Sequence, residues 1–341
     1  MGRAKTGTTA LQNFLSDNPD TLALHKVKYL ETGRYYNTHH PLAWSLHQEA
    51  AKRGDGRYWK RASQYAYLDK QPKSYWAALR KEIKTSPYDT FVISSEEFGV
   101  VLDLHLTAPL LATFLEDVDV SIIVYLRRQD DFLQSVYNQA VKGNEDRFTR
   151  GFWSYVEPIL QVGGADCMKV LSPLSEAIGR DNIKVRIYEK EQLKGDIFDD
   201  FLSVLGIGDA SGFSKPQRVQ NPRLNPRLIP VIRKMNRIPM ESDLRSHLLG
   251  FLSRRYANEG PFISHDLLTP KQRCDLLDKF RESNQQVARE FLGRSDGCLF
   301  YAPEPNPEKE GHQTDISADE ILEVMTELWQ EHANFMARKT E

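Results

Sequence analysis

The sequence predicts an α/β fold in which a mainly parallel sheet is flanked by helices. Along the first 205 residues, short apolar segments typical of buried strands alternate with longer amphipathic segments typical of helices. Such alternation favours parallel strands joined by helical crossovers that cover both faces of the sheet. The 341 residues are ample for one large domain of this class.

The individual elements can be placed from their apolar patterns. The clearest strand is the β-branched run at 121–126, which has the pattern of a strand buried on both faces. The other expected elements are strands at 27–30, 90–94 and 182–188 and helices at 8–17, 41–52, 73–85, 106–116, 130–142, 151–180 and 197–205. Strands and helices thus follow one another through this whole part of the chain.

The pattern changes after residue 205, where helices dominate. We expect helical segments at 226–238, 242–256 and 270–292, and a polar linker at 303–314 that contains three prolines. An amphipathic helix ends the chain, and its apolar stripe favours packing against the body or a homodimer contact. The expected organisation is a core over 1–205, a helical part of the same domain over 206–302, and a linker with the terminal helix over 303–341.

Composition and charge argue against several classes of partner. The net charge is −2 and no basic block occurs, which argues against binding to nucleic acid. No apolar stretch approaches the roughly 20 residues of a membrane span, and the chain does not start with an apolar signal core. Cys167, Cys274 and Cys298 lie far apart and lack metal-ligand spacing. We therefore expect a cytoplasmic protein without a membrane span or a nucleic-acid partner.

The first candidate site is the run Lys5-Thr6-Gly7-Thr8-Thr9, which directly precedes an amphipathic helix. The first N–H groups of a helix are unpaired, and the helix dipole favours an anion there. Gly7 lets the backbone approach a phosphate closely, and Lys5 supplies a positive charge. The segment is therefore a candidate phosphate cradle.

The order of these residues differs from the usual phosphate-binding loop, G-x-x-x-x-G-K-[ST]. Here Lys5 precedes Gly7 instead of following it. An ordinary helix capped by threonine, with a lysine nearby, is the alternative reading. The two readings are nearly balanced on this motif alone, so a second site is needed.

The second candidate site follows the strand at 121–126, which ends in Arg127 and Arg128. This junction places Arg127 at the carboxyl edge of a parallel sheet, where open α/β folds bind ligands. Ser135 follows eight residues later, about two turns into the next helix. A guanidinium with a hydroxyl suits a terminal phosphate. The alternative is that both arginines are surface charges paired with Asp130 and Asp131.

A third candidate is the carboxylate of Glu96, which follows the expected strand at 90–94. A carboxylate at the sheet edge can accept the proton of an attacking alcohol. Capping of the next helix is a serious rival for Glu96, and the catalytic reading is weaker for Glu97. His39 and His40, at the start of another helix, are candidates for the acceptor site, with His40 as an alternative base.

Together, the loop at 5–9 and the pair Arg127 and Ser135 resemble the two nucleotide motifs of sulfotransferases that use 3′-phosphoadenosine 5′-phosphosulfate (PAPS). The resemblance is to the bacterial type and covers roughly residues 2–205. It implies a P-loop-like, three-layer fold, with the 5′-phosphosulfate bound by Lys5, Thr6, Gly7, Thr8 and Thr9. It also implies that Arg127 and Ser135 bind the 3′-phosphate, and that Glu96 is the general base, as in several branches of the family.

The resemblance further implies the reaction. A sulfuryl group would pass from PAPS, as co-substrate and without a required metal, to a hydroxyl of a small molecule or a glycan. Lys5 would neutralise charge on the departing phosphate. Adenosine 3′,5′-bisphosphate would be released.

One departure from the family pattern is the short segment before Lys5, which leaves no room for the strand that precedes the family's loop. We expect that the natural protein has a longer N-terminus, or that this form is truncated and weakly active. Two other functions stay open. One is a P-loop nucleotide kinase or NTPase with Glu96 at a magnesium site, and the other is a non-catalytic nucleotide-binding protein.

Overall fold

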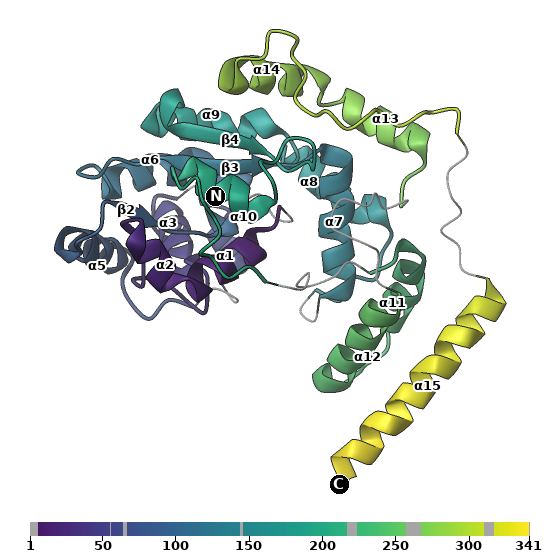
Figure 1. Ribbon diagram of the computed structural model, residues 1–341. Helices are drawn as coiled ribbons and strands as arrows, with labels where there is room; N and C mark the ends of the chain where they lie inside the picture. Colours follow the sequence, from purple (N-terminus) through teal and green to yellow (C-terminus); the bar gives the residue numbers. More distant parts are fainter. Residues whose placement is uncertain are drawn as a thin grey trace. The chain divides into compact units, whose positions relative to one another are not determined.

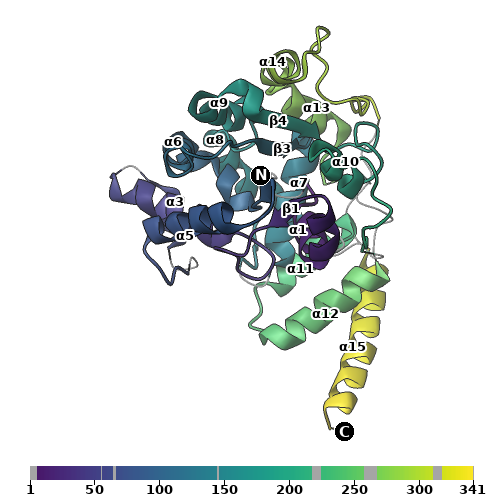
Figure 2. The same cartoon turned by 60° about the vertical axis from the view of Figure 1, so that its left-hand side comes forward.

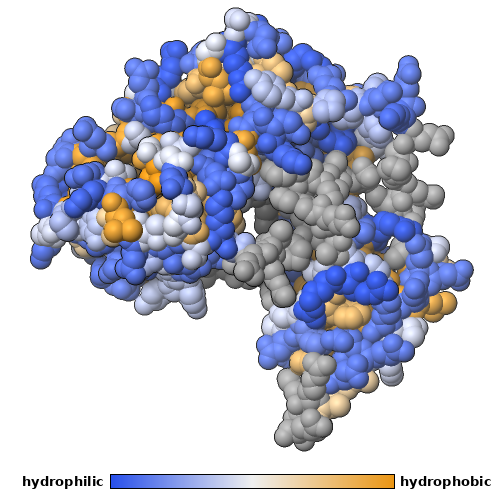
Figure 3. Space-filling model, in the orientation of Figure 1, coloured by the Kyte–Doolittle hydropathy of each residue, from blue (hydrophilic) through white to orange (hydrophobic). Residues whose placement is uncertain are grey.

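The computed structural model describes residues 6–54, 56–63, 67–143, 146–216, 224–256, 267–309 and 317–340 (Figure 1). The chain divides into two compact units. The first unit comprises Met1–Arg128, Ile159–Arg218 and Phe280–Ala302, and the second comprises Gln129–Pro158, Val219–Lys279 and Pro303–Glu341. Each unit is built from segments that are distant in the sequence. The surface visible in Figure 3 is mainly hydrophilic, with scattered apolar patches.

The strands of the first unit pair in parallel, as the sequence predicts. Strand β1 (Val27–Tyr29) pairs with β2 (Thr90–Val92), and β3 (Ile122–Leu126) pairs with β4 (Ile183–Ile187). Within the described residues these strands form two sheets of two strands each. The expectation of one larger sheet is therefore met only in part.

Strand β2 ends two residues earlier than expected because a histidine takes over its backbone groups. The N–H of Ser94 donates to Nδ1 of His39 at 3.2 Å, and the carbonyl of Ser94 accepts from the N–H of His39 at 2.8 Å. Nε2 of the same ring lies 2.9 Å from the carbonyl oxygen of Leu30, just after β1. These bonds satisfy groups that a longer ladder would otherwise use.

Helices pack against both faces of β3, because alternate residues of a strand point to opposite faces. Ile122, Val124 and Leu126 belong to one buried cluster, with residues of α6 (Leu104–Phe114), α9 (Cys167–Ile178) and α14 (Arg281–Leu292). Tyr125 belongs to another, with residues of α1 (Thr8–Asp17), α10 (Ile197–Val204), β1 and β2. The predicted α/β layering is thus present around this strand (Figure 2).

Of the remaining helices of the first unit, several lie close to the predicted positions, whereas those at 19–24 and 58–62 were not predicted, and the helical stretch expected over 151–180 is divided into two helices. Helix α1 has the bounds expected from its apolar spacing. The others are α2 (Pro19–Leu24), α3 (His40–Lys52), α4 (Tyr58–Ala62) and α5 (Pro72–Thr85), and α8 (Phe152–Gln161) crosses into this unit from the second.

The second unit is helical within the described residues. It contains α7 (Gln129–Lys142), α11 (Ile229–Met235), α12 (Ser242–Arg255), α13 (Pro270–Asp278) and α15 (Ala318–Thr340). Its core joins Tyr137 and Val141 of α7 to apolar residues of α11, α12 and α15. The helical C-terminal part of the prediction is confirmed in kind, whereas its boundaries at 205 and 302 stay predictions.

The helix expected over 270–292 is divided into two helices. Helix α13 starts with a capping box in which Thr269 and Gln272 bond to one another's backbone. Helix α14 starts after Phe280, whose ring is buried and whose φ of −113° is not helical. Periodicity runs through this point because both segments are amphipathic, so the break at 279–280 was not predicted.

Candidate functional site

The predicted phosphate loop forms the start of α1, and Gly7 is its N-cap. Gly7 has a φ of +77°, in the left-handed region that glycine adopts without strain. No side chain caps this helix end, and no acidic residue lies in its first turn. The N–H of Leu11 makes the first helical bond to the carbonyl of Gly7, at 3.0 Å. This helix end is therefore suited to an anion.

The threonines of the loop differ in environment. Thr6 and Thr8 are buried, whereas Thr9 is exposed. Among the described residues, the buried hydroxyl of Thr8 has no hydrogen-bond partner. A buried hydroxyl without a hydrogen-bond partner destabilises the fold, and a hydrogen bond to a ligand oxygen would remove that cost. Lys5, predicted for this site, lies outside the described residues.

Tyr188, which the sequence analysis did not single out, contacts two predicted parts of the site. A Cβ placed on Gly7 would lie 3.4 Å from Cε2 of Tyr188 and 3.5 Å from its hydroxyl oxygen. The guanidinium carbon of Arg127 lies 5.7 Å from the centroid of the same ring, a cation–π contact. The phosphate loop and the end of β3 therefore meet at one side chain. Its position directly after β4, at the carboxyl edge, was the signal that could have identified it.

The two arginines at the end of β3 are buried. Arg127 is 5% exposed and Arg128 is 7% exposed, so neither is the solvated surface charge of the alternative reading. Nη1 of Arg128 donates to the carbonyl of Ala302 at 3.0 Å, and Glu189 accepts from the N–H of Tyr301 at 2.7 Å. Arg128 thus fastens a distant segment of the first unit, whereas Arg127 faces Tyr188.

Ser135 lies on α7 in the second unit, and its side chain is buried. The same helix holds Asp130, whose carboxylate accepts from Nε of Arg273 at 2.8 Å within that unit. The predicted partnership of Ser135 with Arg127 stays a prediction.

The carboxyl end of β2 leads into a short 3₁₀ helix, η1 (Glu96–Gly99), which Ser95 caps. Oγ of Ser95 accepts from the N–H of Glu97 at 3.1 Å. The residue that caps this short helix is thus Ser95, and not Glu96 or Glu97 as the alternative interpretation expected. Both carboxylates lie in the first turn, and the hydroxyl of Tyr58 donates to Oε2 of Glu97. Glu97 is therefore held by a structural contact, and Glu96 is half-buried.

The two candidate histidines have different environments. His39 is buried, and desolvation lowers its pKa to about 4 despite its backbone hydrogen bonds. Because its Nδ1 accepts from Ser94, its Nε2 carries the proton and donates to Leu30. Both ring nitrogens are thus occupied. His40 is only partly buried, and its Nδ1 lies 2.7 Å from Oγ of Ser95, next to Glu96. Of the two histidines, His40 is the less buried, and its role as alternative base stays a prediction.

Helix α1 is tied directly to this edge. Nε2 of the buried Gln12 donates to Oγ of Ser94 at 3.3 Å. Nδ2 of Asn37 donates to Oδ1 of Asn13 at 2.8 Å, which fastens the chain before His39 to the same helix. The helix that carries the phosphate loop therefore also positions the segment containing Glu96 and His40.

A network of hydrogen bonds and one ion pair, centred on the buried Asp200, stabilises the end of β3. The carboxylate of Asp200 accepts from the Tyr125 hydroxyl at 2.7 Å and from Nε of Arg186 at 3.0 Å. Burial alone would raise the pKa of Asp200, but these bonds and the N–H of Lys194 hold it below its usual value. The network joins β3, β4 and α10 immediately before Arg127.

Three exposed tyrosines, Tyr35, Tyr36 and Tyr67, lie near one another. Tyr35 and Tyr36 have ring centroids 4.7 Å apart, and Tyr36 is 82% exposed with a φ of +51°. The neighbouring phenol of Tyr36 raises the pKa of Tyr35, and Tyr67 adds to the effect. A tight turn closed by two backbone bonds between Tyr35 and Thr38 holds the tip. Tyr36 is exposed although its positive φ is energetically unfavourable, so the rings of this turn are candidates for contact with a ligand.

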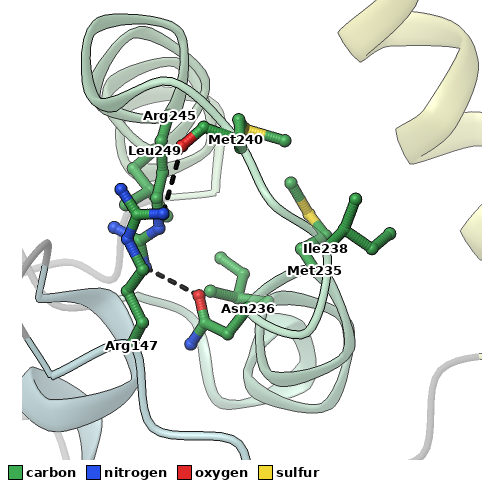
Figure 4. A pocket seen from close by; sticks show the side chains of 8 residues that line it. Arg147, Met235, Asn236, Ile238, Met240, Arg245 and Leu249 are labelled. Carbon is green, nitrogen blue, oxygen red and sulfur yellow. Dashed lines mark hydrogen bonds between the residues drawn. The ribbon is translucent and has the colours of Figure 1, made fainter.

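A small pocket in the second unit is explained by structural contacts (Figure 4). Nη1 of Arg147 donates to the carbonyl of Met240 at 3.1 Å, and Nη2 of Arg245 donates to Oδ1 of Asn236 at 2.8 Å. Arg245 also donates to the carbonyls of Val141 and Lys142, the last residues of α7. A cation at a helix C-terminus is stabilised by the dipole. The pocket therefore belongs to the packing of α7 against α11 and α12.

Two searches of the described residues give negative findings. They contain no cluster of three or more His, Cys, Asp or Glu side chains arranged to hold a metal ion. No described helix has both the length and the apolar character to cross a lipid bilayer.

Comparison with known proteins identifies the family of this chain. The family model described as "Sulfotransferase domain" matches residues 1–201. The chain therefore belongs to the sulfotransferase family. A protein of Archaeoglobus fulgidus, described as an "Uncharacterized protein", is 30% identical over 251 residues. That match covers 73% of this chain and 66% of the relative. No solved structure matches the chain.

Proposed function

We propose that this chain transfers a sulfuryl group from PAPS to a hydroxyl acceptor and releases adenosine 3′,5′-bisphosphate. The observation that carries the proposal is the contact of Tyr188 with both Gly7 and Arg127. It supports a common donor site for the phosphate loop and the buried arginine. Family membership supports the reaction class.

The residues fit an adenosine nucleotide with two anionic ends. The uncapped start of α1 and the orphaned Thr8 hydroxyl suit the 5′-phosphosulfate, and Lys5 precedes them in the sequence. The guanidinium of Arg127 and the hydroxyl of Ser135 suit the 3′-phosphate. No aspartate pair for magnesium has to be invoked, because the sulfuryl group carries less charge than a phosphoryl group.

In the proposed reaction the acceptor oxygen attacks sulfur, and the bond from sulfur to the bridging phosphate oxygen breaks. Lys5 neutralises the charge that develops on that oxygen. Glu96 takes the proton of the acceptor hydroxyl, with His40 as the alternative base. Tyr188 keeps Arg127 oriented, and Gln12 holds the segment before Glu96 in place.

For the acceptor we propose a carbohydrate. Tyr35, Tyr36 and Tyr67 offer exposed rings, and stacking on such rings is a common way to hold the apolar face of a sugar. Asn37, between these rings and His39, is bonded to α1. The turn is therefore anchored to the helix of the donor loop.

The decisive experiment combines a transfer assay with a binding comparison. The purified chain is incubated with PAPS carrying labelled sulfur and a panel of sugars and simple alcohols. Thermal stabilisation by adenosine 3′,5′-bisphosphate is measured beside ATP with magnesium. Transfer of label together with preferential stabilisation by the bisphosphate supports the proposal. Magnesium-dependent ATP turnover would instead identify a kinase or NTPase, and bisphosphate binding without transfer to any acceptor would identify a binding protein.

A further inference from the structure

Helix α15 packs on α12 through one of its sides (Figure 2). Val324 and Leu328 are buried in the core of the second unit. Beside them Glu327 pairs with Arg255 at 3.2 Å, and Glu331 lies 3.2 Å from Nε2 of His247. This inner stripe accounts for the attachment of the helix to its own unit.

A second apolar stripe on α15 is exposed. Leu322, Met325, Trp329 and Met336 are 65%, 51%, 77% and 49% exposed. They follow one another at intervals of three, four and seven residues, and His332 fills the step between the last two. This is the spacing of the core positions of a coiled coil, sustained over about 21 Å of helix. Isolated apolar residues on a surface are ordinary, but four large exposed apolar side chains in line over two heptads are not.

We propose that this outer seam, residues 322–336, pairs with the same seam of a second copy of the chain in antiparallel orientation. A stripe that repeats on both members of a pair can be self-complementary about a two-fold axis. The inference is independent of the sulfotransfer reaction.

The charge along the helix favours the antiparallel orientation. Five carboxylates lie from residue 319 to residue 331, whereas the sequence places Arg338 and Lys339, followed by the single acidic Glu341, near the carboxyl end. A parallel pair would bring like charges together at both ends. An antiparallel pair sets the acidic start of each helix toward the basic end of the other.

Of these carboxylates, three are already paired within the unit. Glu320 contacts Arg227, Glu327 contacts Arg255, and Glu331 contacts His247. Asp319 and Glu323 are exposed and remain for a partner. In the register that sets Trp329 against the partner's His332, Met325 meets the partner's Met336. Position 323 then lies level with position 338 of the partner.

The test is the mass of the full chain in solution, measured by light scattering and sedimentation over a range of concentrations. Trp329→Glu and Met325→Glu place a charge in the outer seam. Asn334→Glu is the matched control, because Asn334 is exposed on the same helix but lies outside the seam. Circular dichroism melting curves establish that all variants are folded.

We expect a dimer for the wild type and for Asn334→Glu, and a dissociation constant at least about 10-fold higher for both seam variants. We also expect added salt to weaken the dimer, since opposite charges meet. A monomeric wild type would overturn the proposal. It would do so even if a fluorescence quencher fails to reach Trp329, because the shielding would then come from the protein's own chain. A dimer that both seam variants retain, or one that salt strengthens, would overturn it too.

Discussion

The guanidinium of Arg127 lies over the ring of Tyr188, 5.7 Å from its centroid. Cε2 and the hydroxyl oxygen of the same side chain lie against Gly7, at the start of α1. Three segments separated by more than 50 residues each thus meet at one aromatic side chain. Changes at any of the three are expected to affect donor binding together.

Replacement of Gly7 by alanine tests the phosphate loop. A non-glycine residue at a φ of +77° costs about 1–2 kcal/mol, so the loop is expected to leave its present conformation. We expect weaker binding of adenosine 3′,5′-bisphosphate by calorimetry. Gly208→Ala is the control, since that site has open space and no positive φ. Full affinity in Gly7→Ala would exclude the loop from the donor site.

Arg127 and Arg128 form a matched pair for mutation. Arg127→Ala is expected to weaken bisphosphate binding by about 2–5 kcal/mol, because a buried charge on the ligand loses its partner. Arg128→Ala is expected to lower the melting temperature with little change in affinity, because Arg128 holds Ala302. Equal losses of affinity in both variants would show that Arg127 has no special role.

Lys5→Ala tests the stabilisation of the departing phosphate. We expect kcat to fall by roughly 10²–10³-fold, whereas the Kd for PAPS changes far less. Lys73→Ala, which removes an exposed lysine from α5, serves as the control. A loss confined to binding would remove the proposed role of Lys5 in the chemical step.

The identity of the base can be read from pH–rate profiles. Glu96→Gln is expected to lower kcat by roughly 10²–10⁴-fold and to abolish the acid limb of the profile. Glu97→Gln is the comparison, because Glu97 is held by Tyr58 and is expected to affect the rate much less. If His40→Ala removes the acid limb instead, the base is His40.

Glu82 is expected to make stability depend on pH. Burial opposes its ionisation, but the N–H groups of Glu31 and Thr32 and the ammonium of Lys28 lower its pKa to about 2. A carboxylate with a lowered pKa contributes stability above its unfolded value of 4.5, and the contribution is lost as the pH falls toward 2.

Glu82→Gln should therefore cost about 1–2 kcal/mol at neutral pH, after allowance for solvent screening, and much less near pH 2. The measurement is urea unfolding at several pH values. Glu116→Gln, which changes an exposed carboxylate just after α6, is the control. A loss in Glu82→Gln that does not vary with pH would contradict the linkage.

Much of the first unit could be predicted because its signals are local. The spacing of Leu11, Phe14 and Leu15 with the stop at Asn18 predicted α1, and the β-branched run before Arg127 predicted β3. The contacts that the sequence left unpredicted are between distant residues. The ring of His39 shortens β2, and the break at Phe280 assigns α13 and α14 to different units. Such tertiary effects leave no periodic signal in the chain.

The candidate site was predictable in its residue types but not in its connections. Gly7 and Arg127 each stand at a junction of recognisable chemistry, whereas Tyr188 is a single aromatic residue after an ordinary strand. The contacts of Ser95 were not predictable either, because its capping bond and its contact with His40 depend on how the ends of β1 and β2 meet.

The hydrogen bonds of Arg128 to Ala302 and of Glu189 to Tyr301 also bear on how the chain is made. Contacts of such long sequence separation form late, because much chain must be ordered to close them. During synthesis the first unit cannot be completed until residue 302 has left the ribosome. By then, the segments Gln129–Pro158 and Val219–Lys279 of the second unit have also emerged. Both units are therefore incomplete at the same time in the nascent chain. Unpaired strand edges exposed during that period favour aggregation.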